Sequence, residues 1–218
     1  MGGDKIVFIK ICGIKTESEL KIVLKFSDYI TAFGMIVGNT ISKRRITFEK
    51  AKELIKNADI PAIAVTSDKS YEDLKKVIDL RPDGIQLHSD ILYDTVDKIK
   101  KEYSGFIFKV FEIEKTIKNP FDEYNKILNL MRLYDVDGFL LDTKGGGTGM
   151  MHDLRVSKLV LNDAVKPVVI AGGINYSNVG EFIKLCPFGI DVSSGVETDG
   201  FKDEKKIKYL LNKIGDFL

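Results

Sequence analysis

Two side chains suited to proton transfer end apolar segments of the kind that form buried strands. Cys12 ends the segment Val7–Cys12, and Asp142 ends the segment Gly138–Asp142. A thiolate can act as a base or nucleophile, and a nearby ammonium group increases the thiolate fraction. A carboxyl group in an apolar mouth has a raised pKa, which suits a general acid. Position alone leaves a packing role open for Cys12 and a loop-capping role open for Asp142.

Glycine-rich loops follow three of the predicted strands and are typical of phosphate binding. They are Gly145–Gly149, Gly172-Gly173 and Ser193-Ser194-Gly195. Small residues let backbone N–H groups close around an anion, and a short helix start adds its dipole. One such loop could merely permit a tight turn, but three together favour a phosphate site. The residues that we expect to form it are Gly147, Gly172, Gly173, Ser194 and Gly195.

Other candidate binding residues are basic. Arg44 and Arg45 follow the second predicted strand, and either guanidinium could hold a carboxylate by paired hydrogen bonds. Such a basic run is also usual in a solvated loop. His88 lies on the inward face beside Gln86, although a lone histidine more often packs than reacts. The two histidines of the chain have no metal-ligand spacing, so we expect no metal site.

These candidates must be positioned by eight short apolar segments that alternate with eight charged, amphipathic ones. The predicted strands are Val7–Cys12, Ile30–Val37, Ala62–Thr66, Gly84–His88, Phe106–Phe111, Gly138–Asp142, Val168–Ala171 and Gly189–Val192. The predicted helices are Glu17–Lys25, Phe48–Asn57, Tyr71–Leu80, Leu92–Glu102, Glu123–Tyr134, Leu154–Asn162, Ser177–Leu185 and Asp203–Ile214. Thr16 with Glu19 and Ser70 with Asp73 fit the capping-box pattern. Alternation along the first strand puts Lys10 and Cys12 on one face.

Repeated strand–helix units imply parallel strands joined by right-handed crossovers. Eight units of about 27 residues fit a (β/α)8 TIM barrel, and no linker divides the chain, so we expect one domain over residues 1–218. The alternative is a doubly wound open sheet, but no dinucleotide fingerprint follows the first strand. In a barrel the active site lies at the carboxyl ends of the strands, where the candidate residues gather.

Composition narrows the function classes. Basic and acidic residues nearly cancel, with 33 against 32, which argues against a nucleic-acid partner. No apolar run approaches the ~18 residues that a membrane span needs, and no secretory cleavage pattern is present. Two cysteines form no disulfide framework. We therefore expect a cytoplasmic protein without membrane partners, whose oligomeric state the sequence leaves open.

Taken together, the motifs resemble the phosphoribosylanthranilate isomerase family of tryptophan biosynthesis. The segments that carry the resemblance are Lys10–Ile14, Gln86–His88, Leu141-Asp142 with Gly146–Gly149, Ala171–Ile174 and Asp191–Glu197. The resemblance implies the Amadori rearrangement of N-(5-phosphoribosyl)anthranilate, a small phosphoribosyl substrate, without a cofactor. It also implies that Asp142 is the general acid and Cys12 the general base.

The same resemblance assigns the substrate-binding residues. Arg44 matches the arginine expected to hold the anthranilate carboxylate, and His88 lies in a matching motif. The loop Gly38–Arg44 departs from the family pattern, so Arg45 is the alternative for this role. Two other functions stay open: another phosphosugar isomerase or lyase on the same type of barrel, and a non-catalytic phosphosugar sensor.

Overall fold

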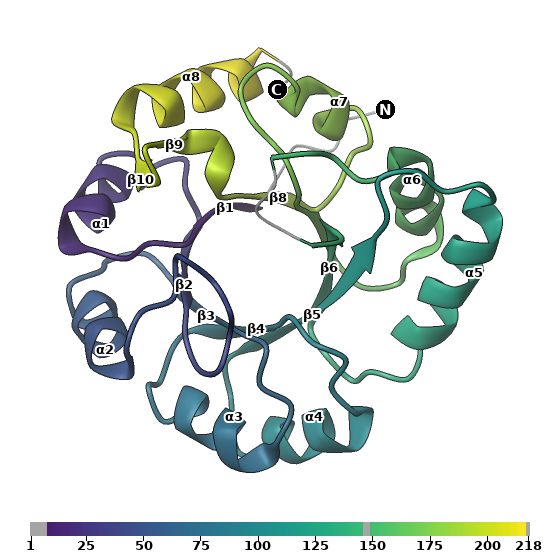
Figure 1. Cartoon of the computed structure of the whole chain (residues 1–218), viewed down its shortest axis with the longest axis horizontal. Helices are drawn as coiled ribbons and strands as arrows, with labels where there is room; N and C mark the ends of the chain where they lie inside the picture. The colour runs from purple at the N-terminus through teal and green to yellow at the C-terminus, as the bar shows by residue number, and fades with distance from the viewer. Residues whose placement is uncertain (1–7, 146–148, 217–218) are drawn as a thin grey trace.

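A closed parallel barrel forms the centre of the molecule. The structure is a computed structural model and describes residues 8–145 and 149–216. Eight strands pair in the order β1 to β8, and helices surround them (Figure 1). β1 pairs with both β2 and β8, so the ring has no free edge. The predicted (β/α)8 TIM barrel is therefore confirmed, and the open doubly wound sheet is wrong.

Strands and helices alternate along the chain as predicted. The strands are β1 (Phe8–Cys12), β2 (Ala32–Ile36), β3 (Ala62–Thr66), β4 (Gly84–Leu87), β5 (Phe106–Ile113), β6 (Gly138–Thr143), β7 (Val168–Ile170) and β8 (Gly189–Val192). The helices are α1 (Glu17–Leu24), α2 (Phe48–Lys56), α3 (Tyr71–Ile78), α4 (Tyr93–Lys100), α5 (Pro120–Met131), α6 (Leu154–Asp163), α7 (Val179–Ile183) and α8 (Glu204–Gly215). No helix within the described ranges is both long and apolar enough to cross a membrane.

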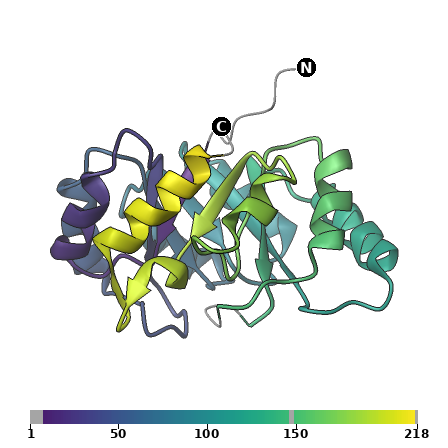
Figure 2. The ribbon, with the colours of Figure 1, turned by 90° about the horizontal axis from the view of Figure 1, so that it is seen from above.

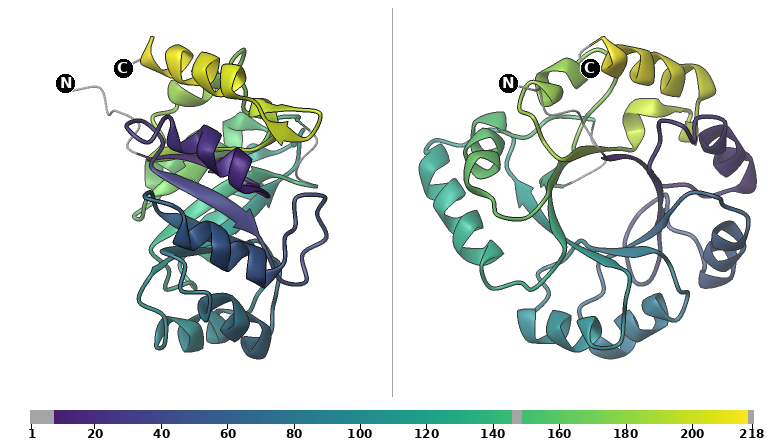
Figure 3. Two further views of the ribbon diagram at one scale, coloured as in Figure 1. Left: turned by 90° about the vertical axis from the view of Figure 1, so that its left-hand side faces the viewer. Right: turned by 180° about the vertical axis from the view of Figure 1, so that it is seen from behind.

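Three short elements between β8 and α8 were not predicted. They are the single 3₁₀ turn η1 (Ser194–Val196) and the antiparallel hairpin of β9 (Glu197–Thr198) with β10 (Phe201–Lys202). Figure 2 and Figure 3 show this hairpin on the same edge of the barrel as the loop between β2 and α2. The hairpin therefore lies at the end of the barrel where the site is expected.

The helix boundaries follow from local capping. α5 begins at Pro120, three residues before the predicted Glu123, because Asn119 caps it and proline is tolerated in the first turn. The predicted capping box at Thr16 is confirmed. The Thr16 hydroxyl accepts a hydrogen bond from the backbone N–H of Glu19 at 3.2 Å, and the Glu19 carboxylate accepts one from the backbone N–H of Thr16 at 3.1 Å. The other oxygen of Glu19 accepts the backbone N–H of Lys202, so the capping residue also ties α1 to β10.

The interior of the barrel contains both apolar and charged side chains. A buried apolar cluster inside the barrel consists of Phe108, Val110, Leu140, Val169 and Ala171, with Phe8 packed against it, and Ala171 reaches the cavity at the carboxyl ends. Ile9 and Ile11 point the other way and join the core under the helices, as the alternation predicted. Lys10, Gln86 and Asp191 meet inside the barrel through hydrogen bonds. The barrel interior thus holds both an apolar cluster and a buried polar group that lies close to the carboxyl ends of the strands.

His152 joins the end of β6 to α6. Its ring is buried, with Nε2 at 2.6 Å from the hydroxyl of Ser157 and Nδ1 at 3.4 Å from the hydroxyl of Thr143. Burial lowers the pKa of His152 to about 4, so the ring is neutral near pH 7. The neutral imidazole therefore links Thr143 at the end of β6 to Ser157 in α6.

Replacing His152 should remove a pH-dependent part of the stability. The folded pKa, about 4, lies below the unfolded value of about 6.5. Stability from this group is therefore complete above about pH 6.5 and is lost as the pH falls toward 4. Between about pH 7 and about pH 4, the free energy of unfolding of the wild type should fall by up to ~3 kcal/mol more than that of His152→Gln. Urea unfolding at several pH values measures this difference, and parallel curves for the two proteins would contradict it.

Candidate active site

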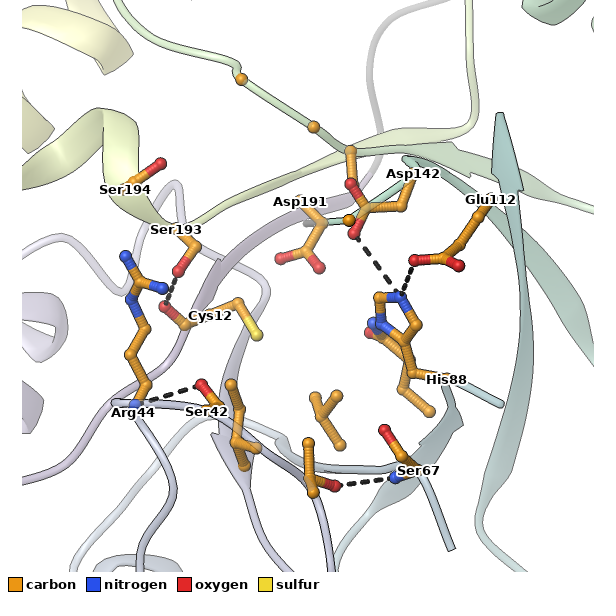
Figure 4. Close-up of a pocket in the computed structure, with 18 of the residues that line it drawn as sticks. Cys12, Ser42, Arg44, Ser67, His88, Glu112, Asp142, Asp191, Ser193 and Ser194 are labelled. Carbon is orange, nitrogen blue, oxygen red and sulfur yellow. Dashed lines mark hydrogen bonds and ion pairs between the residues drawn. The ribbon is translucent and has the colours of Figure 1, made fainter. Parts of the chain in front are cut away.

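A cavity of about 450 Å³ opens at the carboxyl ends of the strands. Its wall includes side chains from β1, β4, β5, β6 and β8 and from the loops that follow them: Cys12, Gln86, His88, Glu112, Asp142, Asp191, Ser193 and Ser194. Figure 4 shows Cys12 on one side of the cavity and Asp142 on the other. The fold therefore brings the two predicted proton-transfer groups to a single cavity.

The floor of the cavity is a buried ion pair. Lys10 Nζ lies 2.6 Å from Asp191 Oδ2 and 2.9 Å from Gln86 Oε1. Burial alone would lower the pKa of Lys10, but the charges of Asp191 and Cys12, together with the hydrogen bond to Asp191, outweigh it and raise that pKa. The second oxygen of Asp191, Oδ1, has no hydrogen-bond partner among the described residues.

Cys12 lies at the end of β1 with its sulfur directed into the cavity (Figure 4). Burial raises the pKa of the thiol, while the ammonium groups of Lys10 and Lys202 oppose that rise. The neighbouring ammonium groups thus favour the thiolate, as expected from the sequence, but burial outweighs their effect on the pKa. Gly34 on β2 makes room for the sulfur, because a Cβ there would lie 2.7 Å from Cys12 Sγ.

Asp142 is on β6, and its side chain is 16% exposed. Burial raises its pKa to about 6, partly offset by His88 and by the N–H of Thr143, which donates to Oδ1 at 2.7 Å. The rise agrees with the sequence argument for a carboxyl group in an apolar mouth. Near neutral pH, a fraction of such a group carries the proton that a general acid needs.

His88 lies between two carboxylates. Its Nε2 is 3.3 Å from Glu112 Oε1 and 4.0 Å from Asp142 Oδ2. The hydrogen bond from His88 is the main cause that lowers the pKa of Glu112. Glu112 is a cavity residue that the sequence analysis does not predict, because the fifth strand was expected to end at Phe111. No group of three or more His, Cys, Asp or Glu side chains in residues 8–145 and 149–216 could hold a metal ion.

The structure separates the two candidate arginines. Arg44 lines the cavity, and its Nε and Nη2 each donate to a different oxygen of Glu197 at 2.7 Å. Arg45 is exposed, does not line the cavity and donates to the backbone carbonyl of Gly38. The position of Arg44 therefore fits ligand binding better than that of Arg45.

The predicted phosphate-binding residues lie after β7 and β8. Gly172, Gly173 and Ser194 line the cavity, whereas Gly195 lies behind them against the backbone carbonyl of Ile174. Gly147 lies outside the described residues. Gly172 has a φ of +92°, and a Cβ there would lie 2.1 Å from the hydroxyl of Thr143. Only glycine fits this approach, which keeps the loop close to the end of β6.

Known proteins match nearly the whole chain. A family model described as N-(5'phosphoribosyl)anthranilate (PRA) isomerase matches residues 9–213. An N-(5'-phosphoribosyl)anthranilate isomerase from Pyrococcus furiosus is 44% identical over 95% of this chain and 97% of its own length. One from Methanococcus aeolicus is 45% identical over 95% of this chain and 98% of its own length.

Solved structures of N-(5'-phosphoribosyl)anthranilate isomerases are also similar to this chain over nearly its full length. The isomerase structure from P. furiosus superposes with a TM-score of 0.85 at 41% identity, covering 96% of this chain and 98% of its own. A phosphoribosyl anthranilate isomerase in complex with reduced 1-(o-carboxyphenylamino)-1-deoxyribulose 5-phosphate has a TM-score of 0.75 at 25% identity, covering 96% and 99% of the two chains. On these matches, the chain belongs to the N-(5'-phosphoribosyl)anthranilate isomerase family.

Proposed function

We propose that the protein catalyses the Amadori rearrangement of N-(5-phosphoribosyl)anthranilate to 1-(2-carboxyphenylamino)-1-deoxy-D-ribulose 5-phosphate. The observation that carries the proposal is the pair of Cys12 and Asp142 on opposite sides of one cavity. Membership of the isomerase family supports it. A relative solved with the reduced form of this product supports the same substrate.

In the proposed mechanism, Asp142 acts first as the general acid. A proton from its carboxyl group goes to the ring oxygen of the ribose, the C1′–O bond breaks, and the anilino nitrogen forms an iminium with C1′. Burial, which raises the pKa of Asp142 to about 6, keeps part of the carboxyl groups protonated for this step. A positioned general acid contributes roughly 10²–10⁴-fold to the rate.

Cys12 then acts as the general base. The iminium makes the C2′ proton acidic, and the thiolate removes it, so that an enolamine forms and the sulfur becomes a thiol. The enolamine tautomerises to the ketone, which completes an isomerisation without net oxidation. Lys10 and Lys202 favour the thiolate against the effect of burial, so both ammonium groups support this role of Cys12.

The two ends of the substrate carry negative charge and need separate sites. Gly172, Gly173, Ser194 and Gly195 are proposed to hold the phosphate, with Gly147 as a further candidate. Backbone N–H groups in such loops suit a phosphate dianion. Arg44 is proposed to hold the anthranilate carboxylate, since its guanidinium borders the cavity.

His88 is proposed to contact the substrate between these two ends. Its Nε2 lies 4.0 Å from Asp142, where the ribose ring would open. The imidazole also forms a hydrogen bond with Glu112, so the ring is already oriented before the substrate enters.

Residues 1–218 are proposed to act as one catalytic domain in the cytoplasm. The family match, which covers residues 9–213, supports the single domain. Substrate and product carry phosphate groups that do not cross membranes unaided, which supports action in the cytoplasm. The partner is then the small phosphoribosyl substrate itself.

The reaction can be tested by fluorescence. Phosphoribosylanthranilate is generated in situ, purified protein is added, and the loss of the anthranilate signal is followed. The wild type should convert the substrate rapidly, whereas Cys12→Ser and Asp142→Asn should each lower turnover by at least ~10², the scale of a lost general acid or base. Circular dichroism verifies that the variants are folded.

The possible results distinguish the reaction itself from the roles assigned to Cys12 and Asp142. No conversion by folded wild-type protein would overturn the reaction and indicate another phosphosugar substrate. Near-wild-type turnover in one variant would remove that residue from its role and leave the reaction in place.

The pH dependence should show a wide plateau. The active form has one proton shared between Asp142 and Cys12, so it is lost when both groups are protonated and when neither is. We expect kcat/KM to rise with pH through about 6, where Asp142 titrates, and to fall only above the ordinary thiol pKa, because burial raises that of Cys12. The profile of kcat is the control, since it does not include phosphate titration in the free substrate. A decline between about pH 7 and about pH 8 would contradict this assignment.

If Arg44 holds the anthranilate carboxylate, replacing Arg44 should change KM and replacing its neighbour Arg45 should not. Arg44→Ala should raise the KM for phosphoribosylanthranilate by ~10-fold or more with a smaller effect on kcat, because it removes a charge-assisted hydrogen bond. Arg45→Ala is the matched control and should leave both constants near their wild-type values. Steady-state kinetics decides between them, and the reverse pattern would assign the carboxylate to Arg45.

A further inference from the structure

Glu197 ends the motif Asp191–Glu197 but does not line the cavity. It begins β9, directly after the 3₁₀ turn, and its side chain is 6% exposed. A carboxylate buried to this extent is costly unless charged partners surround it. Its partners therefore indicate what the residue does.

Three hydrogen bonds from two cations reach this carboxylate. Arg44 donates from Nε to Oε1 and from Nη2 to Oε2, both at 2.7 Å. Lys202 donates from Nζ to Oε1 at 2.6 Å. Hydrogen bonds from Arg44 and the charge of Lys202 outweigh the effect of burial and lower the pKa of Glu197 to about 2. Glu197 is thus a permanent anion between two cations.

The geometry of the arginine contact is specific. The Glu197 carboxylate accepts hydrogen bonds from one edge of the guanidinium, the edge formed by Nε and Nη2. This two-point contact fixes the plane of the group, which a single contact would not do. No hydrogen bond between described residues uses Nη1 of Arg44, so that nitrogen is left for a ligand in the cavity that Arg44 lines.

Lys202 anchors the carboxylate from behind. Its side chain is fully buried, and its Nζ also donates to the backbone carbonyl of Ser193 at 3.2 Å. The backbone N–H of Lys202 donates to Glu19 in α1. Glu197 is therefore held from the β8 loop and from α1, while it holds Arg44 in the loop after β2.

We propose that Glu197 is a positioning residue that orients Arg44, through the two-point contact, so that Nη1 meets the carboxylate of the substrate. This role rests on the function proposed above, because it acts through the substrate contact of Arg44. Glu197 does not line the cavity, so it acts through Arg44. It contributes to substrate binding by removing the freedom of a long side chain before the substrate arrives.

A double-mutant cycle tests this role in the whole protein. The wild type, Glu197→Gln, Arg44→Ala and the double variant are compared by steady-state kinetics with phosphoribosylanthranilate. Glu197→Gln should raise KM by ~10- to 100-fold with little change in kcat, the scale of a hydrogen bond to a charged group. In the Arg44→Ala background the same substitution should leave KM unchanged, because the group that it orients is gone.

A matched control separates orientation from loosening of the hairpin. Asp203 caps α8 and accepts a hydrogen bond from Thr198 in the same hairpin, and no hydrogen bond or ion pair between described residues joins it to Arg44. Asp203→Ala should lower the melting temperature, because it removes the cap, and leave KM at its wild-type value. A KM rise in Asp203→Ala equal to that in Glu197→Gln would overturn the proposal.

Arg44→Lys provides a second test that keeps Glu197 and Lys202 paired. Lysine retains the positive charge but cannot make the two-point contact. We expect its KM to approach that of Arg44→Ala. A wild-type KM in Arg44→Lys, or equal effects of Glu197→Gln in both backgrounds, would overturn the role of Glu197 while the reaction stands. Absence of turnover in the wild type would overturn the reaction and this role together.

Discussion

The ion pair between Lys10 and Asp191 places two buried charges next to the proposed catalytic groups of the barrel mouth. It joins β1 to β8, the two strands whose pairing closes the ring, at an Nζ–Oδ2 distance of 2.6 Å. A buried ion pair is weak evidence for stability, because desolvation offsets much of the attraction. Its effect on neighbouring groups is clearer: burial is the main cause that raises the pKa of Cys12 and Asp142, the charge of Asp191 adds to both rises, and Lys10 lowers the pKa of Cys12.

Most of the fold could be predicted because it depends on local patterns. Apolar segments separated by amphipathic ones predict the strand–helix alternation, and side-chain alternation in β1 correctly placed Ile9 outside the barrel and Lys10 inside. The hairpin of β9 and β10 could not be predicted, since strands of two residues show no periodicity. Its position depends on Glu197 and on Glu19, whose partners lie far away in the sequence.

The candidate site was predicted to the extent that it follows strand ends. Cys12, Asp142 and His88 all reach the cavity for that reason. Glu112 escaped prediction because β5 continues two residues past the apolar segment and keeps its alternation. The choice between Arg44 and Arg45 required the fold, because the deciding partner, Glu197, is 153 residues from Arg44. The dominance of burial over Lys10 in the pKa of Cys12 likewise depends on tertiary packing.

Burial raises the pKa of both proposed catalytic groups. In the free protein the proton is therefore mainly on Cys12, although the mechanism needs it on Asp142. The pKa of Asp142 is about 6 and that of Cys12 lies above its ordinary value, so a single shared proton resides mainly on sulfur. The arrangement that the mechanism uses, a carboxylic acid facing a thiolate, is then a minor tautomer of the free protein. Turnover then depends both on the population of that tautomer and on the rate of the step that starts from it. A change in the barrel floor that brought the two pKa values closer together would raise that population without any new contact to the substrate.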